Sequence, residues 1–210
     1  MSIEHGTMRI DGIGKVGAGS YSKIRIDGVG KIEGDLDFED MRVNGTCKTQ
    51  GELRGDYLSV DGVMTCQDVK VRQLVIDGLM KSEGRKVYAD TIRVDGILKN
   101  DGEVNADRVE INGCASLNDL FGDEITINYG YGHVHVFTFR SFRPEKMNTA
   151  HNIECSKLEA CNITCHSISA TDITLSAHCK VDVISCNGVL RYDSTCRIGK
   201  IDGDCEKIVE

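Results

Sequence analysis

The sequence lacks the patterns of a helical, secreted or membrane-spanning protein. No apolar run is long enough to cross a bilayer, and no charged segment followed by an apolar one marks a secretion signal. Long amphipathic patterns at helical spacing are absent, there is no Trp, and Pro144 is the only proline. With 23 glycines in 210 residues, this profile is typical of many short strands joined by tight turns. We therefore expect a cytoplasmic, all-β protein, and the sequence leaves association with a membrane open.

An excess of basic residues is also missing. The net charge is −8, whereas a nucleic-acid binder needs a basic footprint for phosphate, so nucleic acid is not an expected partner. Ten cysteines without a secretory leader predict reduced thiols that act as small buried side chains. No Cys-x-x-Cys pair occurs, and His133 and His135 have no third ligand at a metal-binding spacing. We expect neither a metal nor a cofactor.

What the sequence does contain is one short phrase that recurs. It reads apolar residue, spacer, apolar residue, Asp or Asn, and Gly, as in "IRIDG" at 24–28 and "IRVDG" at 92–96. Its glycines recur at a nearly constant spacing, at Gly12, Gly28, Gly45, Gly62, Gly78, Gly96 and Gly113. A fixed period of this length without a helical pattern inside it predicts a β-helix, in which each repeat forms one rung.

Residues two apart in a strand point to the same face, so the two apolar columns of the phrase should point inward. The column next to the Asp or Asn is the expected core ladder, and it consists of Ile10, Ile26, Val43, Val60, Ile76, Val94 and Ile111. The residue between the columns should face outward and is Arg in four of seven repeats, with Val75 the poorest fit. The Asp or Asn and the Gly should form a corner, for which we expect left-handed backbone and solvated carboxylates balanced by the arginines.

The regular block covers residues 1–128, and the pattern changes after it. Residues 129–152 form a Phe-rich insertion or connection, in which Phe137, Phe139 and Phe142 are a candidate partner interface. Residues 153–210 predict a second, less regular β-helix block that continues the first or pairs with it. Within it, apolar residues recur every five positions from Ile153 to Ile173, which indicates narrower sides. "HCKVD" at 178–182 aligns with "TCRIG" at 195–199, and this alignment predicts an interior sulfur column of Cys161, Cys179 and Cys196.

Neither end of the repeat offers a polar cap or an amphipathic helix, which soluble solenoids normally need. An open β-helix end presents unpaired main-chain groups and apolar ladder tops to another chain. The chain is therefore expected to bind itself, end to end. The candidate self-assembly residues are Met8, Ile10, Ile24 and Ile26 at one end and Ile198 and Ile201 at the other.

The runs "IRIDGVGKIEGDL", "MRVNGTCKTQGEL" and "IRVDGILKNDGEV" resemble the bactofilins, polymer-forming bacterial cytoskeletal proteins, over residues 8–128. The later run "ITLSAHCKVDVISCNGVL" is similar to the back region of longer Gram-positive members. The resemblance implies a right-handed parallel β-helix and nucleotide-independent filaments or short oligomers without catalysis. It also implies that such a scaffold organises envelope or polarity factors, some of them membrane-associated.

Two other readings compete with the scaffold. A left-handed β-helix acyltransferase needs a strict six-residue period and a catalytic His between subunits. Here the period drifts, and residues 8–128 contain no His, so any chemistry would lie in the back third. No nucleophile with an acid or base partner stands out, so we expect no enzyme and name no catalytic residue. A surface adhesin on the same solenoid is the third reading, and the missing signal and the many cysteines argue against it.

Overall fold

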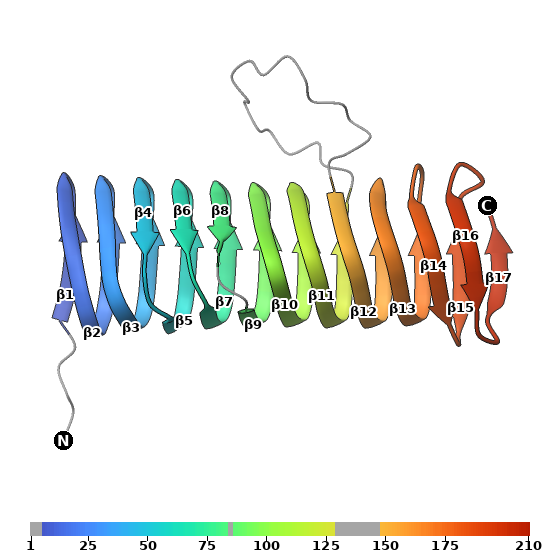
Figure 1. Cartoon of the computed structure of the whole chain (residues 1–210), viewed down its shortest axis with the longest axis horizontal. Coiled ribbons are helices and arrows are strands. Elements are labelled where there is room, and N and C mark those ends of the chain that lie inside the picture. The colour runs from blue at the N-terminus through green and yellow to red at the C-terminus, as the bar shows by residue number, and fades with distance from the viewer. Residues whose placement is uncertain (1–5, 84–85, 129–147) are drawn as a thin grey trace, which may run out of the picture.

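The chain forms one elongated parallel β-solenoid of about 11 turns with rungs of about 17 residues (Figure 1). The computed structural model describes residues 6–83, 86–128 and 148–210, and in these ranges all regular structure is strand. The first strand and the last strand lie at opposite ends of the rod. The predicted all-β solenoid fold and its period are confirmed.

The strands come in chain order along the rod. Those of the regular block are β1 (Gly6–Ile10), β2 (Ile13–Ile26), β3 (Val29–Val43), β4 (Thr46–Thr49), β5 (Leu53–Val60), β6 (Val63–Cys66), β7 (Val69–Ile76), β8 (Leu79–Ser82), β9 (Lys86–Val94), β10 (Ile97–Ile111) and β11 (Cys114–Ile127). Those of the back third are β12 (Asn148–Ala160), β13 (Ile163–Leu175), β14 (Lys180–Cys186), β15 (Val189–Tyr192), β16 (Arg197–Asp202) and β17 (Glu206–Val209).

Each rung pairs with the next in parallel, so that equivalent residues of the phrase stack on one another. Ile10 pairs with Ile26, which pairs with Val43. The register continues through Val60, Ile76, Val94 and Ile111. From Ile26 to Ile111, every member of this core ladder has a relative exposure of 0%. Burying each such side chain contributes on the order of 2 kcal/mol, which makes this column a main source of stability.

The glycine of the phrase has a different role from the expected one. Within the described ranges, positive φ occurs at Gly19, Gly34, Gly203, Asn162 and His178, and at none of the seven phrase glycines from Gly12 to Gly113. The expectation of left-handed backbone is therefore wrong for the corners of the regular block, although Gly203, after Ile201-Asp202, does have it. A Cβ placed on any glycine of the phrase from Gly28 to Gly113 would instead overlap the carbonyl oxygen of the glycine one rung before it. Glycine is required here because successive rungs approach closely through their main chains.

The back third continues the same solenoid. Strand β12 pairs with β11 in parallel, with Leu120 on Ile153 and Ile125 on Leu158, although the insertion separates these two strands in sequence. Between β12 and β13 the rung is shorter than in the regular block, since Ile153 pairs with Ile168. The predicted narrower sides are thus present. The insertion, including Phe137, Phe139 and Phe142, lies outside the described residues.

The predicted sulfur column is only partly correct. Lys180 pairs with Arg197, which places Cys179 on Cys196 as expected. Thr164 pairs with Lys180, however, so Ile163 and not Cys161 lies in register with Cys179. The step between these rungs is shorter than the step from Cys161 to Cys179 that the assumed alignment required. Cys161 is consequently half-buried beside the column.

Candidate self-assembly ends and outer ladders

The two ends of the rod leave strand edges unpaired. At the N-terminal end, β1 pairs only with β2, and residues Ile13–Gly19 of β2 pair only with β3, among the strands described. At the C-terminal end, β16 pairs only with β14, and β17 pairs only with β15, within the part of the chain that the structure describes. Such edges carry free N–H and C=O groups that another chain's strands can bind.

Met8 and Ile10 lie on the outermost described rung at the N-terminal end. Met8 is half-buried and packs against the core, and Ile10 is 7% exposed. Ile24 and Ile26 are fully buried, because β1 covers them. The four predicted residues are therefore neighbours, but only Met8 and Ile10 belong to the end rung itself.

The C-terminal end exposes more apolar surface. Ile198 and Ile201 are half-buried, whereas their partners one rung earlier, Val181 and Ile184, are almost completely buried. The difference arises because Val181 and Ile184 are covered by β16, whereas no described strand pairs with the outer side of β16. Three other partly buried side chains complete this surface: Tyr192, Cys196 and Cys205. Cys205 is not among the predicted end residues. Its position in the sequence, two residues after Ile201-Asp202-Gly203, could have identified it as part of this surface.

Gly12 occupies the end position of the glycine column. A Cβ on Gly12 would meet no atom within 4 Å, unlike one on Gly28 or on the glycines of the later repeats. At every later rung that Cβ would point at the preceding rung, so on Gly12 it points out of the N-terminal end. An alanine here should leave the fold intact and obstruct a chain that stacks on this end.

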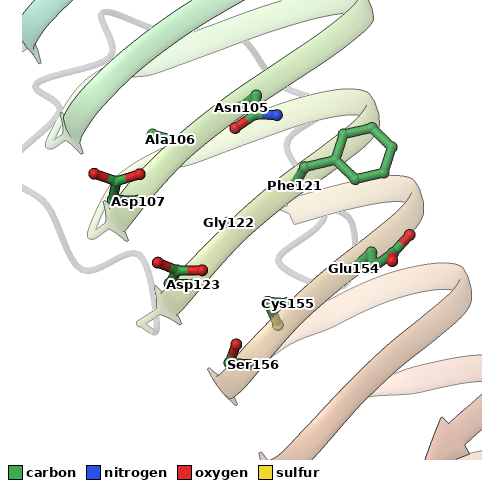
Figure 2. A pocket seen from close by; sticks show the side chains of 9 residues that line it. All are labelled: Asn105, Ala106, Asp107, Phe121, Gly122, Asp123, Glu154, Cys155 and Ser156. Carbon is green, nitrogen blue, oxygen red and sulfur yellow. The ribbon is translucent and has the colours of Figure 1, made fainter.

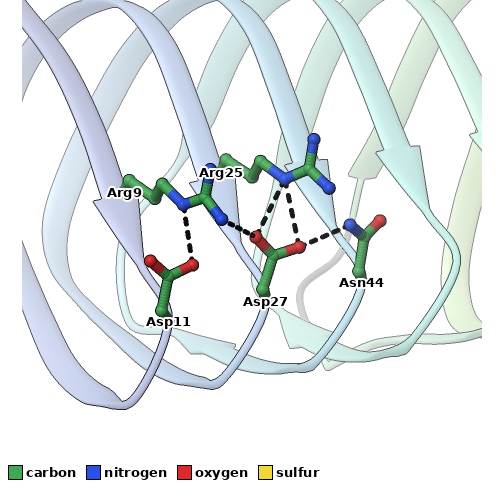
Figure 3. Close-up of polar contacts among 5 residues, drawn as sticks. All are labelled: Arg9, Asp11, Arg25, Asp27 and Asn44. Carbon is green, nitrogen blue, oxygen red and sulfur yellow. Dashed lines mark hydrogen bonds and ion pairs between the residues drawn. The ribbon is translucent and has the colours of Figure 1, made fainter.

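Arginines and aspartates form ion pairs along the corner, as Figure 3 shows for the first rungs. Arg9 Nε lies 2.7 Å from Asp11, and its Nη2 lies 3.3 Å from Asp27 in the next rung. Arg25 binds Asp27 at 2.9 Å, and Asn44 Nδ2 donates to the same carboxylate at 2.6 Å. The hydrogen bonds from Arg25 and Asn44 hold the pKa of Asp27 below its usual value. At Asp11, Asp27 and Asp95 the corner carboxylates are thus balanced by arginines, as the sequence indicated.

This ladder has a gap in the middle of the rod. Ser59 and Val75 stand where the other rungs place arginine, so Asp61 and Asp77 have no arginine two residues before them. Desolvation, together with the neighbouring Asp61 and Asp95, raises the pKa of Asp77. The charged form of Asp77 is therefore disfavoured in the folded protein.

Replacing Asp77 with Asn should stabilise the protein at pH 7 by on the order of 0.5 kcal/mol, as expected for an exposed charge. Because folding raises the pKa of Asp77, its carboxyl favours the fold only below the unfolded pKa, and this contribution is lost as the pH rises. The gain of Asp77→Asn should hence vanish below about pH 4. The difference in unfolding free energy between the variant and wild type is measured at pH 7 and below pH 4 by urea unfolding, with circular dichroism as the signal.

Asp27→Asn is the matched control, with the opposite sign. Folding lowers the pKa of Asp27, so its contribution is present above the unfolded pKa and is lost as the pH falls. The variant should be less stable than wild type at pH 7 and equal to it at low pH. Equal effects of the two substitutions at pH 7 would contradict the gap in the ladder.

All ten cysteines are free, and six of them are buried. Burial raises the pKa of the Cys47, Cys66 and Cys165 thiols to about 12. In the back third, the sulfur atoms of Cys179 and Cys196 both lie close to the Ser176 carbonyl oxygen, at 3.2 and 3.1 Å. The thiols of the buried group stay protonated at neutral pH and are poor nucleophiles.

A shallow depression of about 360 Å³ crosses β10, β11 and β12 (Figure 2). Its lining residues are Asn105, Ala106, Asp107, Phe121, Gly122, Asp123, Glu154, Cys155 and Ser156. Burial raises the pKa of the Cys155 thiol to about 12, so the one sulfur nucleophile in the lining is protonated. The carboxylates of Asp107 and Asp123 have no imidazole beside them in this lining.

The described histidines lie on the surface of the back third. The rings of His151 and His166 stack with centroids 4.8 Å apart, and His166 Nδ1 is 3.1 Å from Asp182. Within the described ranges, no three His, Cys, Asp or Glu side chains are grouped so that they could hold a metal ion. His133 and His135 lie outside those ranges.

No helix long and apolar enough to span a membrane is found in the part of the chain that the structure describes. Comparisons of the chain with protein-family models, with curated proteins and with solved structures found no match.

Proposed function

We propose that this protein is a non-enzymatic structural protein whose units join through the ends of the solenoid into nucleotide-independent filaments or short oligomers. The single observation that carries the proposal is the pair of open ends. Each end combines unpaired strand edges with partly buried apolar side chains that pack against the core. A stacked unit would extend the main-chain ladder and cover Met8 at one end or Ile198 and Ile201 at the other.

The resemblance to the bactofilins supports the same function. It extends the proposal to a cytoplasmic scaffold in bacteria that recruits envelope or polarity factors, including membrane-associated proteins. The shallow depression has a protonated thiol and no imidazole in its lining, which favours this role over an enzyme.

The test compares two variants that each block one end. Gly12→Ala places a methyl group outside the N-terminal rung, and Ile198→Asp places a charge in the half-buried C-terminal rung. Each variant should keep the circular dichroism spectrum of wild type. Sedimentation velocity and negative-stain microscopy without nucleotide should show long assemblies for wild type, and monomers or dimers for each variant.

Mixing the two variants reveals which ends meet. If the N-terminal end binds the C-terminal end, each variant alone is a monomer and the mixture forms one-to-one dimers. If like ends meet, each variant alone forms a dimer through its unchanged end. If both variants sediment like wild type, the units do not assemble through their ends. Discrete trimers that persist in both variants would instead favour the acyltransferase arrangement.

A further inference from the structure

A mostly apolar ladder also runs along the outside of the solenoid, one residue after each glycine of the phrase from Gly12 to Gly96. Its members stack in register from rung to rung, and they are Ile13, Val29, Thr46, Val63, Leu79 and Ile97. Ile13 is 91% exposed, Val29 50% and Val63 46%. Of the four large hydrophobic side chains that are exposed in the described ranges, three belong to this outer ladder. Aligned apolar exposure of this kind marks an interaction surface.

Charged columns of opposite sign border the outer ladder. On one side runs the corner column, with Asp11, Asp27, Asp61, Asp77 and Asp95. On the other side, two residues beyond the apolar positions, runs a column of Lys15, Lys31, Lys48, Lys81 and Lys99, in register and interrupted by Thr65 between Lys48 and Lys81. One rung therefore reads negative, apolar, positive across the face, as in Asp77, Leu79 and Lys81.

This pattern is complementary to itself in one orientation. Suppose that two rods lie parallel and are related by a two-fold axis along their length. The aspartate and lysine columns of the second rod then lie in the reverse order across the contact face. The outer ladder of one copy then faces that of the other, and Lys81 faces Asp77 of the second copy. In an antiparallel pair, lysine would face lysine and aspartate would face aspartate, which is unfavourable. We propose that two copies of this chain pair side by side and parallel through the outer ladder.

The charges of the free chain are compatible with this contact. Glu33 binds Lys15 and Lys31, and Glu83 binds Lys81, but these pairs are exposed and each contributes less than about 1 kcal/mol. Asp77, which lacks an arginine two residues before it, can accept Lys81 of the second copy, whereas Asp61 would face Thr65. An anionic lipid surface or a nucleic acid fits less well, because the aspartate column borders the outer ladder as closely as the lysine column does.

The contact is small for a single pair of units. Six rungs at ~4.8 Å and a face of about 13 Å give on the order of 300 Å² per partner, against about 800 Å² in a standard interface. A lone pair should therefore be weak, whereas end-stacked units present the contact repeatedly and gain avidity. The strength of lateral pairing thus rests on the proposed end-to-end assembly, but its geometry does not.

Cysteine cross-linking tests the geometry in single units and in assemblies. A parallel two-fold axis brings every outer-ladder residue opposite its own copy, so Val29→Cys and Val63→Cys should each form disulfide dimers under copper–phenanthroline oxidation. Gln73→Cys, exposed on another face, and wild type are the controls. We expect at least tenfold more dimer on non-reducing gels than in the controls, with a lower yield in the Gly12→Ala/Ile198→Asp background. In an antiparallel contact, only residues near the two-fold axis face their own copies, so cross-linking at only one position indicates that arrangement. Cross-linking at neither position indicates that no second copy binds this face. Either result overturns the proposal.

A charge swap tests the pairing of the columns. Lys81→Asp should reduce the cross-linking of Val63→Cys at least threefold, because it places Asp opposite Asp77 of the second copy. Adding Asp77→Lys restores opposite charges across the two-fold axis and should restore the yield. Circular dichroism verifies that both variants fold. A double variant that cross-links as poorly as Lys81→Asp would overturn the parallel pairing.

Discussion

Gly62→Ala should destabilise the solenoid by on the order of 3 kcal/mol, because its methyl group overlaps the Gly45 carbonyl oxygen. That oxygen accepts a hydrogen bond from Val63 N–H at 2.8 Å, and Gly62 N–H itself donates to Val43 at 2.9 Å. The added methyl can be accommodated only if the two rungs move apart, which breaks these bonds. Urea unfolding followed by far-ultraviolet circular dichroism measures the loss, since the chain has no Trp for fluorescence.

Gly12→Ala is the control for this prediction. It makes the same chemical change at the same position of the phrase, but its methyl group meets no atom. Its unfolding midpoint should match that of wild type when both are measured as unassembled chains. If Gly62→Ala were as stable as Gly12→Ala, the glycine column would not be required for rung stacking.

Ile76→Asp should have the largest effect on stability of any change considered. Ile76 is fully buried between Val60 and Val94, and its strand β7 lies in the middle of the regular block. The substitution removes about 2 kcal/mol of apolar burial and leaves a carboxyl without a partner, which costs several kcal/mol more. The total approaches the stability of a typical domain, so the central rungs should open.

Hydrogen exchange monitored by mass spectrometry locates this opening. Protection should fall most in β5, β7 and β9, and less at the distant rungs, because each rung contacts only its neighbours. Gln73→Asp on the same strand, with an exposed side chain, should keep wild-type protection. Unchanged protection around Ile76→Asp would show that this column does not hold the rungs together.

The core ladder could be predicted from the sequence because its information is local and repeated. Ile26, Val43 and Val60 each carry the same two-residue pattern, and a parallel ladder places each on its equivalent in the next rung. The ion pairs of Arg9 and Arg25 could be predicted in the same way, since donor and acceptor are two residues apart.

Predictions that required the path of the chain between rungs were less successful. Cys161 was misplaced because the rung length changes within the back third, and a single shifted turn moves a residue out of its column. The glycines of the phrase were recognised as necessary, but for a reason that their backbone angles do not support. Ile24 and Ile26 were assigned to the end, although the short strand β1 already covers them.

By itself, the sequence determined that the chain is a parallel solenoid whose rungs follow the period of the phrase, because burial of an apolar column requires each rung to stack on the next. Only the tertiary structure decided that the back third continues the same rod, and which side chains lie at its open ends. The tertiary structure also decided that the residues after the phrase glycines form an outer ladder, between the aspartate column and the lysine column. These features depend on how rungs are placed over one another, and contacts between residues far apart in sequence set that placement.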